Sequence, residues 1–269
     1  MFVVYIIVSI IMVVGIIACI LGVYYTKKKN NLIIVTVTNI PNDQRLALLK
    51  QTILNSGFQD SDIKVLTTPA NSKWTWNERL IVWKNFYKEL PPEQLVLSLD
   101  AFDVLLFGNK KEIIKKFNSF KADLVFGWTH YCWPAECPIC FNYSDKPKFI
   151  NPHLNSYCFL CAGAYMGKAG YLAKLLEENP WEPNVDDQCY FSGLYENDKE
   201  DKIKLDLKNI IFQNTTPTYW NMGILKFSGK KSVRLLNNQL NSMPNVFHFD
   251  SYHYSEKDLK LSHDLMTKK

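Results

Sequence analysis

Two carboxylates, Asp100 and Asp103, follow directly after the apolar run Leu95–Leu99. Such a run predicts a buried strand, and α/β sheets bind their ligands at the turns beyond the carboxyl ends of their strands. Paired carboxylate oxygens at that position can hold Mn²⁺ or Mg²⁺ against a diphosphate. The alternative is a strand followed by a solvated acidic turn, and the Asp-x-x-Asp spacing alone does not separate the two interpretations.

A second carboxylate pair, Asp186 and Asp187, has types and spacing suited to work on a substrate. Adjacent carboxylates repel one another, so at least one is expected to have a raised pKa. Such a group can orient or deprotonate an acceptor hydroxyl. The alternative is a helix that begins here and is capped by an aspartate.

Apolar and amphipathic segments alternate along the chain and predict an α/β domain with a mostly parallel central sheet. Thr36 and Thr38 then lie at the carboxyl end of the first strand, where hydroxyls can meet a nucleoside; β-branched residues are equally ordinary in strands. Asn77 is the expected N-cap of the second helix. Strands are predicted at 32–38, 63–66, 95–99, 123–128 and 205–210, and helices at 44–56, 78–90 and 110–117.

Three further motifs occur in a fixed order after the first aspartate pair, with the segment 159–167 between the first and second of them. They are Cys132-Trp133-Pro134, Val185-Asp186-Asp187-Gln188 and the run from Leu205 to Asn214. Together these residues resemble the glycosyltransferase domain of procollagen lysyl hydroxylases and the related collagen glycosyltransferases. The resemblance runs from about Leu32 to about His248. It implies a GT-A-like domain that transfers galactose or glucose from a UDP-sugar to hydroxylysine or galactosyl-hydroxylysine of a collagen-like protein.

The resemblance also implies roles for single residues. It completes a metal site with His248, and an imidazole beside two carboxylates suits Mn²⁺ better than Mg²⁺. It places Phe102 against the nucleotide base, Arg79 against the diphosphate, and Trp133 and Gln188 in the donor pocket. His253 and Asp250 remain alternative ligands.

One segment departs from the family pattern. Cys161, Ala162, Gly163 and Ala164 stand where the family usually carries Asn-Ser-Gly-Gly. Two polar groups that could contact the sugar or the acceptor are therefore missing. A shifted sugar preference, a different acceptor and weakened activity are all compatible with this change.

The cysteine spacing offers a different hypothesis. Cys137, Cys140, Cys158 and Cys161 form two C-x-x-C pairs, and their separation predicts a structural Zn²⁺ site. With Cys132 and Cys189 they make a set that can instead pair as disulfides in an oxidising compartment, or stay as buried thiols. A zinc- or disulfide-stapled, membrane-anchored binding protein without strong catalytic activity is the alternative to an enzyme.

Residues 2–25 contain no charged side chain and would span about 36 Å as a helix, which predicts a transmembrane anchor at 1–29 before the catalytic domain at 30–269. A cleaved signal peptide is the alternative. Lys27, Lys28 and Lys29 favour a cytoplasmic domain, whereas the resemblance implies the lumen of the endoplasmic reticulum or Golgi. Sequons at Asn142 and Asn214 are usable only in the lumen. Nucleic-acid binding is a poor third choice, because the net charge of +5 is modest and Lys27 to Lys29 lie beside the predicted membrane span.

Overall fold

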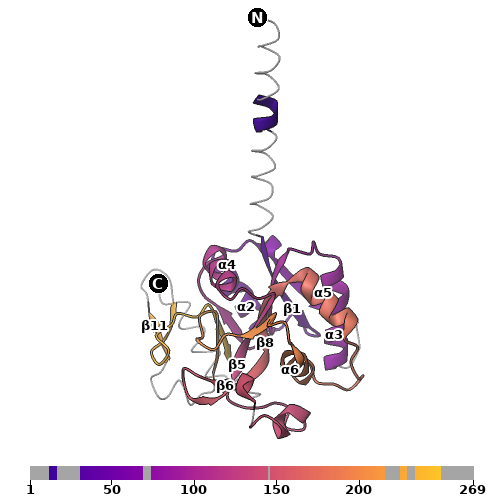
Figure 1. The fold of residues 1–269 in the computed structure, drawn as a ribbon. Helices are drawn as coiled ribbons and strands as arrows, with labels where there is room; N and C mark the ends of the chain where they lie inside the picture. The colour runs from indigo at the N-terminus through magenta and orange to yellow at the C-terminus, as the bar shows by residue number, and fades with distance from the viewer. Residues whose placement is uncertain are drawn as a thin grey trace, which may run out of the picture.

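A six-stranded sheet forms the centre of the domain (Figure 1), in the order β2-β1-β3-β8-β5-β9. The computed structural model describes residues 12–16, 31–68, 74–144, 146–215, 225–228 and 234–249, with the backbone alone at 225–228. The strands are β1 (Leu32–Thr38), β2 (Ile63–Thr67), β3 (Leu95–Leu99), β5 (Leu124–Thr129), β8 (Phe159–Lys168) and β9 (Ile203–Leu205). Strand β8 runs antiparallel to both of its neighbours, while the remaining pairs are parallel. The sheet is therefore mixed, with one reversed strand that the sequence did not predict.

Helices cover both faces of this sheet. On one face α3 (Trp76–Lys88), α5 (Ala169–Glu178) and α6 (Asp187–Asn197) pack on a cluster of buried aromatic and aliphatic side chains. On the other face α2 (Gln44–Asn55) and α4 (Lys110–Ser119) pack on a second apolar cluster. Figure 1 shows α3 and α5 side by side, and the two helices are in contact.

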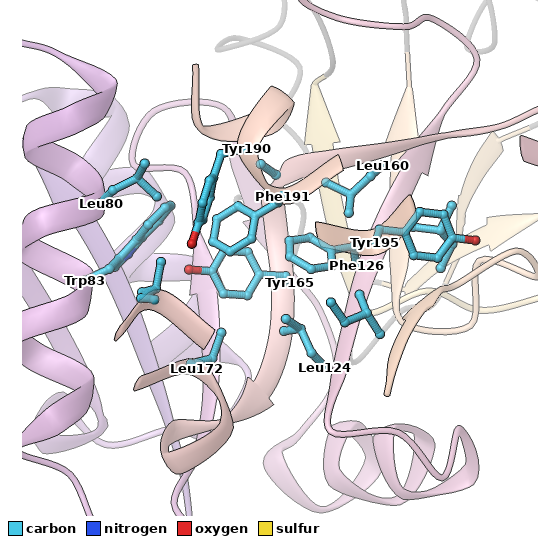
Figure 2. Packing of buried hydrophobic residues seen from close by; sticks show 14 of the residues in the cluster. Leu80, Trp83, Leu124, Phe126, Leu160, Tyr165, Leu172, Tyr190, Phe191 and Tyr195 are labelled. Atoms are coloured by element: carbon cyan, nitrogen blue, oxygen red, sulfur yellow. The ribbon is translucent and has the colours of Figure 1, made fainter. Parts of the chain in front are cut away.

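Aromatic side chains dominate the first cluster (Figure 2). Trp83 of α3 meets Tyr165 of β8 with ring centroids 5.5 Å apart, and Phe191 of α6 meets Phe126 of β5 at 5.2 Å. Such contacts add about 0.5–1.5 kcal/mol each beyond burial of area. They fix α3 and α6 on the same face of the sheet, and the first turns of these two helices border the cavity described below.

The helix boundaries follow from local capping. Helix α2 begins after Asp43, whose side chain accepts a hydrogen bond from the backbone N–H of Arg45, and the chain leaves it at Gly57 with a φ of +82°. The prediction for that helix is confirmed within one residue. The prediction of Asn77 as a cap is wrong, because the hydroxyl of Thr75 accepts from the N–H of Glu78 and α3 starts earlier. Asn77 instead accepts a bond from the indole of Trp181 at 2.8 Å.

A second sheet brings the C-terminal part of the chain to the central sheet. It consists of β10 (Phe212–Thr215), β13 (Val246–Phe249) and β4 (Val104–Leu106) in that order, with β13 parallel to β10 and antiparallel to β4. The prediction of one strand through 205–210 is wrong. Strand β9 ends at Leu205, and the Asp206 carboxylate accepts the backbone N–H groups of Ile210, Ile211 and Phe212, which redirects the chain into β10. The remaining elements are β6 (Ile150–Asn151), β7 (Ser156–Tyr157), β11 (Leu225–Ser228), β12 (Arg234–Asn237) and the 3₁₀ turns η1 (Asp60–Asp62), η2 (Pro138–Phe141) and η3 (Pro147–Phe149).

Two disulfides replace the predicted zinc site. Cys132 pairs with Cys140, and Cys137 pairs with Cys189 at the start of α6. The zinc prediction for Cys137, Cys140, Cys158 and Cys161 is therefore wrong, since two of its four sulfurs are bonded to other cysteines. Cys158 and Cys161 are buried thiols. The alternative of disulfide pairing is confirmed for Cys132, Cys137, Cys140 and Cys189.

Most of the predicted anchor at 1–29 lies outside the described residues, which include only 12–16 of it, so the transmembrane helix, its lysine flank and the domain boundary at residue 30 remain predictions. No helix within the described ranges is long and apolar enough to cross a membrane. The alternative ligands Asp250 and His253 also lie outside these ranges. Of the two sequons, Asn142 is exposed, whereas Asn214 is 7% exposed and is closed to glycosylation in the folded domain.

Candidate active site

A cavity of about 550 Å³ lies at the carboxyl ends of β1 and β3, beside the first turns of α3 and α6. This volume falls within the range of about 300–1,000 Å³ that is usual for small-molecule sites. Its position agrees with the expectation for an α/β sheet. The lining includes two arginines, four aspartates and one histidine, namely Arg45, Arg79, Asp100, Asp103, Asp186, Asp187 and His248.

Three metal-ligating side chains converge in the cavity. Asp100 follows β3, Asp103 precedes β4, and His248 lies on β13, where it pairs with Val104 of β4. Nε2 of His248 lies 3.7 Å from Oδ2 of Asp100 and 3.6 Å from Oδ2 of Asp103. One ligand atom from each of the three residues lies within 4.8 Å of the others. Two carboxylates and one imidazole at this spacing form a donor set that suits Mn²⁺.

The surroundings of these three residues leave room for an ion. Gly163 of β8 lies against them, and a Cβ at this position would be 2.4 Å from Cε1 of His248 and 2.9 Å from Oδ2 of Asp100. Oδ1 of Asp103 is buried and has no hydrogen-bond partner among the described residues. A cation would satisfy this oxygen and occupy space that any larger residue at Gly163 would fill. The residues present therefore fit a divalent cation.

His248 is held on the side of its ring away from the carboxylates. Its Nδ1 lies 3.0 Å from Oδ1 of Asn214 and 3.4 Å from Sγ of Cys161. Burial by itself lowers the pKa of His248, but Cys161 and Asp103 raise it, and the net pKa lies well above the ordinary value. Because Asn214 and Cys161 both contact Nδ1, the opposite nitrogen, Nε2, is directed at Asp100 and Asp103.

Arg79 links this cluster to the second carboxylate pair. Its guanidinium forms an ion pair with Asp100, and its Nη1 lies 3.1 Å from Oδ2 of Asp187. The group also stacks on Trp83, 4.3 Å from the ring centroid. Arg79 is 4% exposed yet lines the cavity, so a diphosphate bound there would share it with two carboxylates.

Asp186 and Asp187 occupy different environments. Asp186 is the N-cap of α6, and its side chain accepts from the backbone N–H groups of Gln188 and Cys189. The helix-cap interpretation therefore holds for Asp186. Asp187 is 3% exposed, and burial raises its pKa to about 7, although Arg79 opposes the shift. Of the two, Asp187 has the titration range that an acid–base group needs near neutral pH.

Gln188 connects the cavity floor to the loop that carries Trp133. Its Oε1 accepts from the N–H of Ala162 at 3.2 Å, and its Nε2 donates to the carbonyl of Trp133 at 3.3 Å. The loop is further tied to α6 through the Cys137–Cys189 disulfide. These links place Trp133 at the cavity wall, where it is 47% exposed.

Comparison with known proteins identifies the family. Residues 77–257, more than half of the chain, match the PLOD GT domain. The chain belongs to this glycosyltransferase family. The expectation drawn from the ordered motifs is thereby confirmed.

Relatives of this PLOD GT domain are much longer proteins. A procollagen-lysine,2-oxoglutarate 5-dioxygenase of Drosophila melanogaster is 32% identical over 126 residues, which are 46% of this chain and 16% of the relative. The human multifunctional procollagen lysine hydroxylase and glycosyltransferase LH3 is 27% identical over 58% of this chain and 20% of its own length. The corresponding Caenorhabditis elegans protein is 25% identical over 81% of this chain and 30% of its own length. The match thus spans less than a third of each relative.

Solved structures with similar folds include two glycosyltransferases. Apo mouse xyloside xylosyltransferase 1 has a TM-score of 0.48 at 11% identity, covering 82% of this chain and 97% of its own. A glycosyltransferase involved in glycosylation of the major capsid of PBCV-1 has a TM-score of 0.46 at 12% identity, covering 87% and 99%.

Phe102 lines the cavity, and the guanidinium of Arg45 lies over its ring at 4.4 Å from the centroid; its stacking on a base remains a prediction. A base stacked on Phe102 would use the opposite face or displace Arg45. Thr36 and Thr38 do not belong to the lining, contrary to expectation. Both are buried on the α2 side of β1, and the hydroxyl of Thr38 accepts from the N–H of Ile40. Val37, which points to the opposite face, lines the cavity instead.

Sequence reasoning missed several lining residues. Arg45 lies in the first turn of the helix that follows β1, a position that the topology of α/β sheets marks as a ligand site. Gly163 could have been noticed as a glycine inside a strand, which often marks a close approach. The other missed residues are Asn39, Trp74, Trp76, Ala101, Tyr131 and Phe249.

Proposed function

We propose that this domain transfers galactose or glucose from a UDP-sugar to a hydroxyl acceptor, with Mn²⁺ held by Asp100, Asp103 and His248. The observation that supports it best is the convergence of these three ligands in a cavity large enough for a nucleotide-sugar, in a chain of a glycosyltransferase family. When bound, Mn²⁺ would neutralise charge on the departing nucleoside diphosphate.

The chain's own residues divide the remaining tasks. Arg79 offers a guanidinium to the phosphates while it orients Asp100. Phe102 offers a ring to the base, and Trp133 and Gln188 border the space for the sugar. Asp187, whose pKa is about 7, orients the acceptor hydroxyl and takes its proton.

The acceptor in this proposal is hydroxylysine or galactosyl-hydroxylysine of a collagen-like protein. Support comes from the relatives named as procollagen lysine hydroxylases and glycosyltransferases. Tyr131 and Trp133, which are 65% and 47% exposed, offer aromatic surface to an acceptor beside the cavity.

We further propose a single-pass membrane protein of the endoplasmic reticulum or Golgi, with residues 1–29 as the anchor and the domain in the lumen. Support comes from the uncharged segment 2–25 and from two disulfides, which form in oxidising compartments.

The test is UDP release by the detergent-solubilised full chain, measured with a panel of UDP-sugars in Mn²⁺ or in chelator. We expect Mn²⁺-dependent release from UDP-galactose or UDP-glucose and its loss in an Asp100→Asn, Asp103→Asn double variant. Asp123→Asn serves as a matched control, because Asp123 pairs with Lys168 and does not line the cavity. Absence of release from every UDP-sugar by folded protein would refute the proposal and favour a disulfide-stapled binding protein.

A further inference from the structure

We propose that Asn214 is a positioning residue that sets His248 in the orientation and tautomer needed to bind the metal ion. Asn214 lies on β10, directly opposite His248 of β13 in the strand register. Its Oδ1 is 3.0 Å from Nδ1 of His248, and its Nδ2 donates to the carbonyl of Trp128 at 2.9 Å. The inference rests on the proposed function only in taking the ion at His248 as the cofactor.

The two contacts of Asn214 fix the direction of its bond to His248. The amide group meets a carbonyl oxygen at Trp128, so its NH₂ must face Trp128 and its oxygen must face the imidazole. The opposite orientation would place two oxygens against each other. Because the amide oxygen only accepts, Nδ1 carries the proton and donates it. In the neutral ring the lone pair is then on Nε2, the atom that faces Asp100 and Asp103.

The fold is arranged to hold this amide. A Cβ on Gly127 of β5 would lie 2.6 Å from Nδ2 of Asn214, so only glycine leaves space for the side chain. The pairing of β5 with β8 shifts register between Phe126 and Gly127, at the same place. Gln213 donates from Nε2 to the carbonyl of Asn214 at 2.8 Å and accepts a bond from Asn237 at 2.7 Å. The backbone and the side chain of Asn214 are therefore both fixed.

Other roles for Asn214 fit the structure less well. Its sequon is closed, since the side chain is buried and its NH₂ is bonded to Trp128. A purely structural amide would not need to face Nδ1 of His248. Sγ of Cys161, at 3.4 Å from the same nitrogen, is a weak acceptor and would hold the ring less firmly without Asn214. Hydrogen bonds of this kind to metal-bound histidine are worth about 10–100-fold in metal affinity.

The experiment measures the dissociation constant for Mn²⁺ by electron paramagnetic resonance of the free ion, using the detergent-solubilised full chain. Asn214→Leu removes the acceptor and should weaken Mn²⁺ binding about 10–100-fold. Asn214→Asp keeps an acceptor for Nδ1 and should bind Mn²⁺ more tightly than Asn214→Leu, despite losing its donor to Trp128. Asn151→Leu is the matched control, because Asn151 is fully buried, donates to the carbonyl of Leu207 at 2.9 Å and does not line the cavity. It should lose stability without loss of Mn²⁺ affinity.

A second readout reports the ring itself. In chelator, at a pH high enough that the His248 ring is neutral, its ¹⁵N chemical shifts should show a proton on Nδ1 in the wild type and a mixture of tautomers in Asn214→Leu. Wild-type Mn²⁺ affinity in folded Asn214→Leu, or a wild-type ring protonated only on Nε2, would overturn the proposal while leaving the transferase proposal standing. If the wild type bound no Mn²⁺, the proposed metal dependence and the metal-positioning role of Asn214 would fail together, and UDP release would show whether the transferase remains. If Asn214→Leu does not fold, the wild-type shifts and the Asn214→Asp affinity still decide the question.

Discussion

Replacement of Gly163 by alanine should strongly weaken metal binding while leaving the fold intact. The added Cβ would lie 2.4 Å from Cε1 and 2.6 Å from Nε2 of His248, and 2.9 Å from Oδ2 of Asp100. Ordinary contact begins at 3.4 Å, so the ring must retreat by about 1 Å, the difference between 3.4 and 2.4. Metal–ligand distances tolerate shifts of only about 0.2 Å. The methyl group would also occupy part of the space that the ion needs.

The magnitude can be bounded from this geometry. Overpacking of a buried site by one methyl group costs about 1–3 kcal/mol of stability, which a domain of this size tolerates. Loss of His248 as a ligand should weaken Mn²⁺ binding by at least about 100-fold, equivalent to about 2.7 kcal/mol. The pairing of β8 with β3 should persist, because the N–H of Asp100 donates to the backbone carbonyl of Gly163, which the substitution keeps.

The assay combines Mn²⁺ titration with thermal unfolding in chelator. Gly193→Ala is the control: Gly193 lies in α6, and a Cβ there would meet nothing within 4 Å. That variant should bind Mn²⁺ normally and gain up to about 1 kcal/mol of stability from higher helix propensity. Wild-type Mn²⁺ affinity in a folded Gly163→Ala variant would refute the assignment of the ion to the space between Asp100 and His248.

Three further predictions concern stability, measured by urea unfolding in chelator. Folding raises the pKa of Asp187 from 3.8 to about 7, so the folded state holds a proton that the unfolded state releases between those pH values. As the pH rises from about 4 to about 7, the free energy of unfolding of the wild type should therefore fall relative to that of Asp187→Asn, and above pH 7 the difference should stay level. A difference that is constant over the whole range would contradict the raised pKa. Replacing Cys137 and Cys189 together by serine opens a link across a sequence separation of 52 residues and should cost about 4 kcal/mol, whereas an unchanged midpoint would show that the bond does not form. Asp206→Ala leaves three backbone N–H groups without their carboxylate and should cost about 3 kcal/mol or more. Asp201→Asn, at a side chain 76% exposed, keeps a residue type that tolerates the φ of +55° there and should change little.

The sequence predicted those parts of the fold that depend on local pattern. The apolar run at β3 and the acidic turn after it located Asp100 and Asp103 without any comparison. His248 came from the family resemblance, since a lone histidine after a short strand carries no local signal. Its convergence with the two aspartates depends on the pairing of β13 with β4, which periodicity cannot predict.

Other features escaped prediction for identifiable physical reasons. Strand β1 is buried on both faces, so its continuous apolar pattern did not show that Thr36 and Thr38 point away from the cavity. The direction of β8 is set by its neighbours and leaves no trace in its composition. The two C-x-x-C pairs satisfied the spacing of a zinc site, yet the partner of Cys137 is a cysteine at the start of α6, far along the chain.

The three proposed metal ligands are synthesised at very different times. Asp100 and Asp103 emerge from the ribosome early, whereas His248 lies on β13, which must insert between β10 and β4 before the three meet. Contacts this distant in sequence form late, because the intervening loop must first close. A nascent or C-terminally truncated chain can therefore assemble much of the central sheet while the proposed metal site is incomplete, and gain of Mn²⁺ affinity would report the docking of β13 between β10 and β4.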